Sequence, residues 1–296
     1  MILTVGDSVC WGQGLKEEHK FDFLVATAKS IQFQRTAHSG AIIGTSKDTS
    51  TVIEPGEIPL GLPSVWQQVL TPRDWSQVEL VLLNGGINDV SLSRILSPAT
   101  SASQLASWID QFCDKEMQEL LEATAGKLTV PGARIAVIGY YPILSFQSGQ
   151  TPIQFQSLLE IHGVATHSVL ASSQFSLLDL VPQVIDNCLA FWQKSNVALQ
   201  AAVDAANATL GRTACVFVKL PFAEQNALWA PHSLLWELTP LLLPEDEVSD
   251  PREKVCQILY GDVVHIPQWV QCVRASLGHP RVEGAARIAS AVLAAL

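Results

Sequence analysis

The amino-acid sequence predicts an α/β fold, specifically a three-layer α/β/α sandwich with a mostly parallel central sheet. Two observations carry this prediction. Short apolar runs alternate along the chain with longer stretches whose apolar residues recur every three or four positions. Runs of that length favour buried strands, and the longer spacing is typical of helices. Strands and helices in alternation imply right-handed crossovers and a sheet covered by helices on both faces.

The individual elements follow from the same patterns. Strands are expected at residues 1–5, 80–83, 134–138 and 214–218, with a weaker candidate at 31–36. Helices are expected over residues 105–123, 184–206 and 285–296. Two segments, 145–183 and the proline-rich 220–262, do not fit the alternation. They are expected to form loops and short helices that shape a substrate cleft.

Length and composition predict one globular domain spanning residues 1–296. The hydrophobic fraction is 48% and the charged fraction only 16%, which suits a large buried core. No Gly/Ser-rich or Pro-rich linker divides the chain, and α/β domains of this size are common. The formal charge of -10, with no run of Lys or Arg, disfavours partners that carry phosphate backbones. Nucleic-acid binding is therefore not expected.

Targeting patterns suggest a cytoplasmic protein, with a trimmed leader or a larger parent protein as the alternative, and no cofactor is expected. No apolar stretch approaches the roughly 20 residues that a membrane helix needs, and no basic segment precedes a signal-like apolar run. The histidines form no metal-ligand pair, so no metal is predicted. The cysteines lack a CxxC pair, and we expect reduced, mostly buried thiols. They are Cys10, Cys113, Cys188, Cys215, Cys256 and Cys272.

Two candidate loops follow predicted strands, where open parallel sheets place their sites. Gly6, Asp7 and Ser8 come directly after the first strand, and the segment 84–89 comes after the strand at 80–83. Gly6 permits a tight turn, and a serine at the start of the following helix lies where backbone N–H groups favour negative charge. A lone GDS tripeptide is more often an ordinary turn or helix cap, so other segments have to support it.

Four segments together supply that support. They read GDSVCWGQGL near the start, AHSGA at 37–41, LNGGINDV at 83–90 and GHPRVEGAARIA at 278–289. In order and spacing the sequence resembles the SGNH (GDSL-like) hydrolases, and the match spans nearly the whole chain. The resemblance implies a flavodoxin-like sheet, Ser8 as nucleophile and His279 as general base. It also implies an oxyanion hole formed by the backbone N–H groups of Ser8 and Gly40 and the side-chain amide of Asn88.

The sequence departs from the family at the acid of the triad. The catalytic histidine normally follows an acid by three positions, but Ser276 stands there. A main-chain carbonyl can orient an imidazole, so the Ser276 carbonyl, or its hydroxyl, is the expected partner of His279. Asp262 remains an alternative orienter from a neighbouring loop. Asp262 also precedes His265 at the family spacing, but His265 lacks the glycine and helix that follow His279.

The expected activity is serine-dependent hydrolysis of a carboxylic ester through an acyl-enzyme, by an esterase or lipase-like acyl hydrolase. The expected substrate is a small-molecule or lipid ester, or an acyl group bound to a carrier. Two alternatives stay open. One is an acyltransferase or transesterase acting on a biosynthetic intermediate, and the other is an inactive binding module, motivated by the missing acid. The sequence does not define the oligomeric state.

Overall fold

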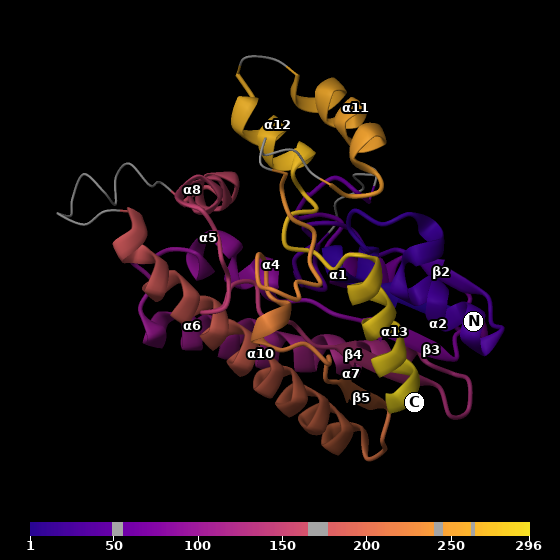
Figure 1. Ribbon diagram of the computed structural model, residues 1–296. Coiled ribbons are helices and arrows are strands. Elements are labelled where there is room, and N and C mark those ends of the chain that lie inside the picture. Colours follow the sequence, from indigo (N-terminus) through magenta and orange to yellow (C-terminus); the bar gives the residue numbers. More distant parts are fainter. Residues whose placement is uncertain (49–55, 165–176, 240–244, 262–263) are drawn as a thin grey trace.

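A five-stranded sheet lies at the centre of the computed structural model, which describes residues 1–48, 56–164, 177–239, 245–261 and 264–296 (Figure 1). The strands are β1 (Ile2–Val5), β2 (Phe33–Arg35), β3 (Leu80–Leu83), β4 (Arg134–Ile138) and β5 (Cys215–Val218). All pairings are parallel and the spatial order is β2-β1-β3-β4-β5. This order is the flavodoxin-like arrangement, so the predicted fold class is confirmed.

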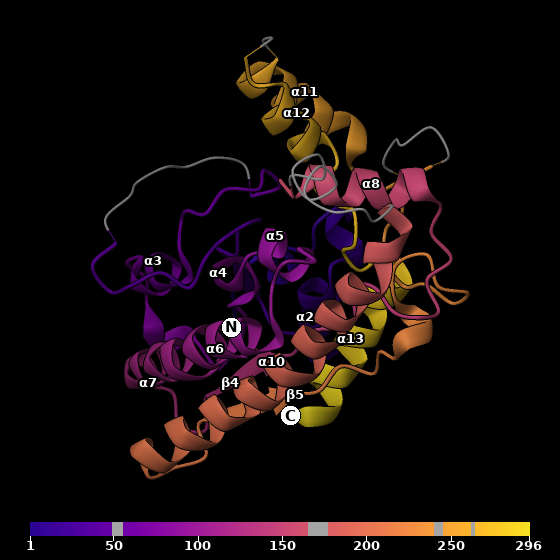
Figure 2. The same ribbon diagram turned by 90° about the vertical axis from the view of Figure 1, so that its left-hand side faces the viewer.

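Helices cover both faces of the sheet. Helices α2 and α13 pack together over one face, and α3, α7 and α10 cover the other, as Figures 1 and 2 show. The helices are α1 (Ser8–Trp11), α2 (Phe21–Lys29), α3 (Val65–Leu70), α4 (Ile87–Val90), α5 (Leu92–Ile95), α6 (Ala102–Ile109), α7 (Met117–Lys127), α8 (Pro152–Ile161), α10 (Val181–Leu210), α11 (Ser249–Tyr260), α12 (Ile266–Val273) and α13 (Val282–Ala295). A π-helical turn (Asp110–Glu116) joins α6 to α7. Short 3-10 turns lie at Glu17–His19, Trp75–Gln77, Leu177–Leu180 and Glu224–Asn226.

The central strands are almost completely buried, as their short apolar runs predict. Every residue of β1 and β3 is buried, and β4 is buried from its second residue onward. Strands β1, β3 and β4 run in register, with Val5 beside Leu83 and Leu83 beside Val137. Their carboxyl ends therefore form one edge, from which the following loops emerge side by side.

The three predicted helices exist and are longer than expected. Residues 102–127 are helical throughout, α10 begins three residues earlier and ends four later than the expected 184–206, and α13 begins at Val282. Helix α2 lies outside the predicted elements. Among the described residues, none of the helices combines the length and the apolar character that crossing a bilayer requires.

The two irregular segments contain more helix than their sequence patterns indicate. Segment 145–183 contains α8, and segment 220–262 contains α11. In Figure 1, α8, α11 and α12 lie above the end of the sheet that carries α1 and α4, and Figure 2 shows them above α4 from the side. These helices therefore stand at the edge where the strands end.

A disulfide between Cys256 and Cys272 joins α11 to α12. The expectation that all six cysteines are reduced thiols is wrong for this pair, whereas the other four cysteines are free and buried. The two cysteines are 16 residues apart in sequence, so the search for CxxC pairs does not detect them. They meet because α11 and α12 pack antiparallel around a small separate cluster of apolar side chains.

Removing this disulfide should lower the stability of the protein. A cross-link that closes a loop of this length stabilises a folded protein by about 3 kcal/mol through the entropy of the unfolded chain. We expect Cys256→Ser/Cys272→Ser to lower the urea midpoint, and a reductant to lower the midpoint of the native protein to the same value. The double variant serves as the control, because its own midpoint should not respond to reductant. If reductant does not change the urea midpoint of the native protein, the expectation is wrong.

Candidate active site

Ser8 is the first residue of α1, immediately after the edge formed by β1. The turn that presents it depends on Gly6, which has a φ of +138°. A Cβ at this position would lie 2.4 Å from Oδ1 of Asn84 and 2.8 Å from its carbonyl oxygen. Only glycine combines this backbone conformation with such a close approach. The tight turn predicted for Gly6 is therefore present, and it brings the Ser8 loop against the loop after β3.

Asp7 caps α1 and ties three loops together. Its carboxylate accepts hydrogen bonds from the Val9 backbone N–H at 2.8 Å, from Nδ2 of Asn84 at 2.9 Å and from the Tyr140 hydroxyl at 2.9 Å. The Tyr140 hydroxyl in turn accepts from the Ile87 backbone N–H at 3.1 Å, at the start of α4. Complete burial raises the pKa of Asp7, and these donors oppose the rise. The network therefore links the carboxyl ends of β1, β3 and β4.

Ser8 and His279 are in direct contact, although they lie 271 residues apart in sequence. The Ser8 Oγ lies 2.7 Å from Nε2 of His279, and Nδ1 lies 3.3 Å from the Ser276 carbonyl oxygen. A hydroxyl donates to Nε2 only in the neutral imidazole whose proton is on Nδ1. The Ser276 carbonyl accepts that proton's hydrogen bond, which favours this tautomer.

The backbone around His279 is held by a second segment of chain. The Trp236 N–H donates to the His279 carbonyl at 2.7 Å, and the Gly278 N–H donates to the Trp236 carbonyl at 3.0 Å. An antiparallel bridge between Leu235 and Pro280 extends this pairing. Part of the irregular segment 220–262 therefore supports the loop that carries the imidazole.

The two expected groups of Ser276 point in different directions. Its carbonyl faces the His279 ring, while its hydroxyl donates to Asp246 at 2.5 Å. Of the two groups expected as the orienter, the carbonyl is thus the one in contact with the imidazole. Asp262, the other expected orienter, lies outside the described residues.

Three N–H donors border the same pocket as the Ser8 hydroxyl. Within the described part of the chain, the backbone N–H groups of Ser8 and Gly40 have no hydrogen-bond acceptor. The Asn88 amide uses one N–H on the Ala41 carbonyl at 3.0 Å, which leaves the other free. Gly40 has a φ of +77°, and a Cβ there would lie 2.7 Å from the Leu60 nitrogen. The geometry thus brings all four expected residues to one pocket.

That pocket has a volume of about 350 Å³ and a largely apolar wall. Its apolar side chains come from the segments that follow β1, β2, β3 and β4, from α8, the helix within the irregular segment 145–183, and from the loop before α13. They are Val9, Ile42, Pro59, Leu60, Ile87, Leu92, Tyr140, Tyr141, Ile143, Leu158, Ile161 and Leu277. None of the described residues of 220–262 lines the pocket.

Burial changes the protonation of two imidazoles at this pocket. It lowers the pKa of His279 to about 4, the Arg252 charge lowers it further, and the hydrogen bond to Ser276 opposes both effects. Burial likewise lowers the pKa of His162, at the end of α8, to about 4, and His279 adds to the lowering. Near neutral pH, both rings are therefore neutral. His162 had no predicted role, because nothing in the sequence distinguishes it from a surface histidine.

No group of three or more His, Cys, Asp or Glu side chains among the described residues is arranged to hold a metal ion.

No protein-family model matches the chain, and no curated protein matches it in sequence. Among solved structures, phospholipase A1 from Streptomyces albidoflavus NA297 is similar at a TM-score of 0.46 and 14% identity, over 83% of this chain and 90% of that one.

Two carbohydrate-active esterases are also similar. An acetyl xylan esterase from Butyrivibrio proteoclasticus matches at a TM-score of 0.42 and 12% identity, over 98% of this chain and 60% of that one. A carbohydrate esterase family 2 enzyme from Corynascus thermopiles (Myceliophthora fergusii), which also has a carbohydrate-binding domain, matches at a TM-score of 0.36 and 16% identity. The match covers 78% of this chain and 59% of that one. At such values the likeness does not extend to activity.

The pKa of His279 can be measured directly. An ordinary histidine takes up a proton near pH 6.5, but burial should hold the folded His279 ring neutral down to about pH 4. Because the unfolded chain binds that proton first, His279 should lower the stability as the pH falls from 6.5 towards 4. The measurement is an NMR titration of the ring protons, with His279→Gln to assign the signal. A midpoint near 6.5 would contradict the expectation.

Proposed function

We propose that this chain hydrolyses a carboxylic ester, with Ser8 as nucleophile and His279 as general base. The observation that carries the proposal is the 2.7 Å contact between the Ser8 hydroxyl and Nε2 of His279, two residues that line a largely apolar pocket. A serine hydroxyl is a weak nucleophile unless a base takes its proton as it attacks. A neutral imidazole within hydrogen-bond reach is such a base.

The first half of the reaction forms an acyl-enzyme. The Ser8 oxygen attacks the ester carbonyl while its proton passes to Nε2 of His279, and the carbonyl oxygen becomes an oxyanion. The N–H groups of Ser8 and Gly40 and the second N–H of Asn88 then donate to that oxygen. One such donor contributes about 3 to 4 kcal/mol to the transition state. Collapse of the intermediate expels the alcohol, which takes the proton from Nε2.

The second half repeats these steps with water. His279 removes a proton from a water molecule, the resulting hydroxide attacks the acyl carbon, and the same donors hold the second oxyanion. Breaking the bond to the Ser8 oxygen releases the carboxylic acid and returns the proton to the serine. The low pKa of His279 keeps the ring neutral near neutral pH, which is the form in which Nε2 can accept the serine proton.

The pocket wall favours an apolar acyl group. Aliphatic and aromatic side chains make up most of the lining, and α8 contributes Leu158 and Ile161. A volume of about 350 Å³ is larger than an acetyl group requires. We therefore assign the wall to an acyl chain of several carbons.

Labelling with a fluorophosphonate tests the nucleophile. The reagent should modify the native protein, and the adduct should be on Ser8, because an activated serine attacks phosphorus as it attacks an ester. Ser8→Ala should abolish both labelling and ester hydrolysis, and His279→Gln should reduce both by at least about 1,000-fold. Mass spectrometry of the digested protein locates the adduct.

Ser145, a buried serine away from the imidazole, provides a matched control. Ser145→Ala should label like the native protein. Failure of the native protein to label, under conditions that modify a control serine esterase, would favour an inactive binding module instead.

A series of p-nitrophenyl esters tests the acyl pocket. Each methylene buried on binding contributes about 0.8 kcal/mol, so kcat/KM should rise about fourfold per carbon from acetate until the pocket is full. Ile161→Phe should shorten the preferred chain, because Ile161 is buried in the pocket wall. Ile153→Phe, on the exposed face of the same helix, is the control and should not change the profile. A preference for acetate in the native protein would exclude this assignment.

A further inference from the structure

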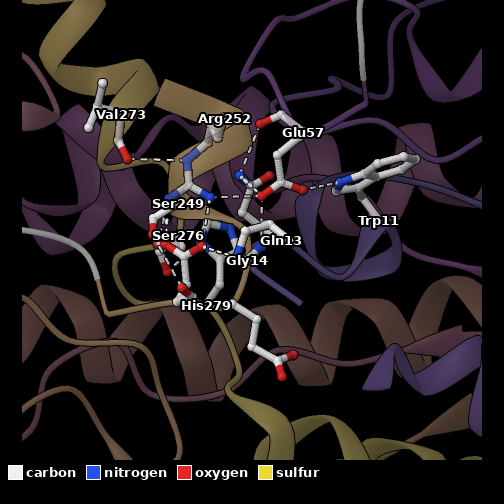
Figure 3. Close-up of polar contacts among 12 residues, drawn as sticks. Trp11, Gln13, Gly14, Glu57, Ser249, Arg252, Val273, Ser276 and His279 are labelled. Carbon is white, nitrogen blue, oxygen red and sulfur yellow. Dashed lines mark hydrogen bonds and ion pairs between the residues drawn. The ribbon is translucent and has the colours of Figure 1, made fainter. Parts of the chain in front are cut away.

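Arg252 is a fully buried arginine between the two parts of the proposed catalytic site. Its guanidinium forms ion pairs with Asp246 and, at 2.9 Å, with Glu57, and its Nε donates to the Val273 carbonyl at 3.1 Å. The side chains of Arg252 and Asp246 have no exposed surface. Figure 3 shows the arginine at the centre of these contacts, with Glu57 on one side and Ser276 on the other.

On one side this cluster reaches the residue that contacts the imidazole. The Ser276 hydroxyl donates to Asp246 at 2.5 Å, and Nη2 of Arg252 lies 3.4 Å from the same hydroxyl. The Ser276 carbonyl in turn accepts from His279 at 3.3 Å. Asp246 therefore acts on His279 through one intervening residue, and Ser276 is itself buried.

On the other side the cluster reaches the turn that carries the serine. Glu57 accepts from Nε1 of Trp11 at 2.6 Å, from Nε2 of Gln13 at 2.8 Å and from the Gly14 N–H at 2.9 Å. The Gln13 N–H donates to the Ser8 carbonyl at 3.1 Å. The end of α1 and the turn after it are thus bound to the same arginine.

We propose that Asp246 and Arg252 are positioning residues that replace the absent acid of the triad, by holding Ser276 so that its carbonyl orients His279 towards Ser8. The inference rests on the proposed hydrolytic function. Among the described residues, no carboxylate contacts the His279 ring. A carbonyl on a loop can orient an imidazole only if the loop itself is held in place. A buried carboxylate that is paired with an arginine can hold such a loop through charge-assisted hydrogen bonds.

The cluster also fixes the distance between the two reacting side chains. Arg252 binds Glu57 on the serine side and Asp246 on the histidine side, so one rigid guanidinium sets the position of both. The disulfide lies one helical turn further along α11, at Cys256, and its partner Cys272 precedes the Val273 carbonyl that Arg252 binds. The cross-link therefore keeps Arg252 against the Ser276 loop.

Single substitutions give the first test. Asp246→Asn removes the charge and should lower kcat by about 100-fold, because a misplaced catalytic group costs that much. Ser276→Ala removes only the hydroxyl link, leaves the carbonyl and should lower kcat by about 10-fold. Neither substitution should change KM by more than about threefold, because neither residue itself lines the pocket. Rates are expressed per serine labelled at the end point of a fluorophosphonate reaction run to completion, so that misfolded molecules are not counted and slow labelling does not change the count.

A relocated carboxylate gives the second test. Asp246→Ala should be as slow as Asp246→Asn, and Asp246→Ala/Ser276→Asp places the carboxylate three positions before His279, where the related family carries its acid. The double variant should recover at least 10-fold in kcat over Asp246→Ala. A cluster that only stabilised the fold would not be rescued in this way.

A second buried carboxylate provides the matched control. Asp22 has no exposed side-chain surface and pairs with Arg35, as Asp246 pairs with Arg252, but it does not contact the Ser276 loop. Asp22→Asn should lower the melting temperature and leave kcat per labelled serine within about twofold of the native value.

The outcomes separate this inference from the function on which it rests. If the native protein neither labels nor hydrolyses esters, the proposed function fails. If the native protein is active and Asp246→Asn and Ser276→Ala keep its kcat, Asp246 and Arg252 are not positioning residues. Loss of kcat without rescue by the double variant would also overturn the proposal, because the carboxylate would then act as a support for the fold alone.

Discussion

The hydrogen bond between Ser8 and His279 is the interaction that the rest of the site depends on, and it joins the two ends of the chain. One partner is placed by the sheet, since β1 ends three residues before Ser8 and the buried Asp7 network fixes the turn between them. The other partner stands on a loop without regular structure. That loop needs support from Trp236, from the Leu235–Pro280 bridge and from the side chain of Ser276.

The two sides of the site are therefore built by different physical means. Parallel strands deliver Ser8, Asn84 and Tyr140 to one edge through backbone hydrogen bonds that any apolar strand can form. Placing His279 requires buried charge, and burying charge is costly unless each ion is paired and hydrogen-bonded. Arg252, Asp246 and Glu57 meet that condition, with burial raising the pKa of Glu57 and the arginine opposing the rise. In the proposed site, these three residues together take the place of a single acid that would contact His279 directly.

The helical hairpin of α11 and α12 supports the cluster of Arg252, Asp246 and Glu57, because Arg252 lies on α11. Its own apolar core is small, comprising Ile58 and Val273 around the Cys256–Cys272 bridge. A small core buries little surface, and a cross-link compensates by limiting the unfolded chain. The disulfide therefore contributes to the site indirectly, through the helix that carries Arg252.

Sequence alone determined the strands of the sheet, the flanking helices α7, α10 and α13 and the loops at the edge of the strands, because periodicity of apolar residues reflects local geometry. It also singled out Ser8, Gly40, Asn88 and His279, through motifs that each lie within a few residues. Tertiary structure alone decided the pairing of Cys256 with Cys272, the position of His162 and the contacts of Asp246. These depend on residues far apart in the sequence, several of them in irregular segments where no period predicts which side chains meet. The sequence alone does not show whether an arginine such as Arg252 is buried or exposed to solvent, because burial depends on tertiary packing.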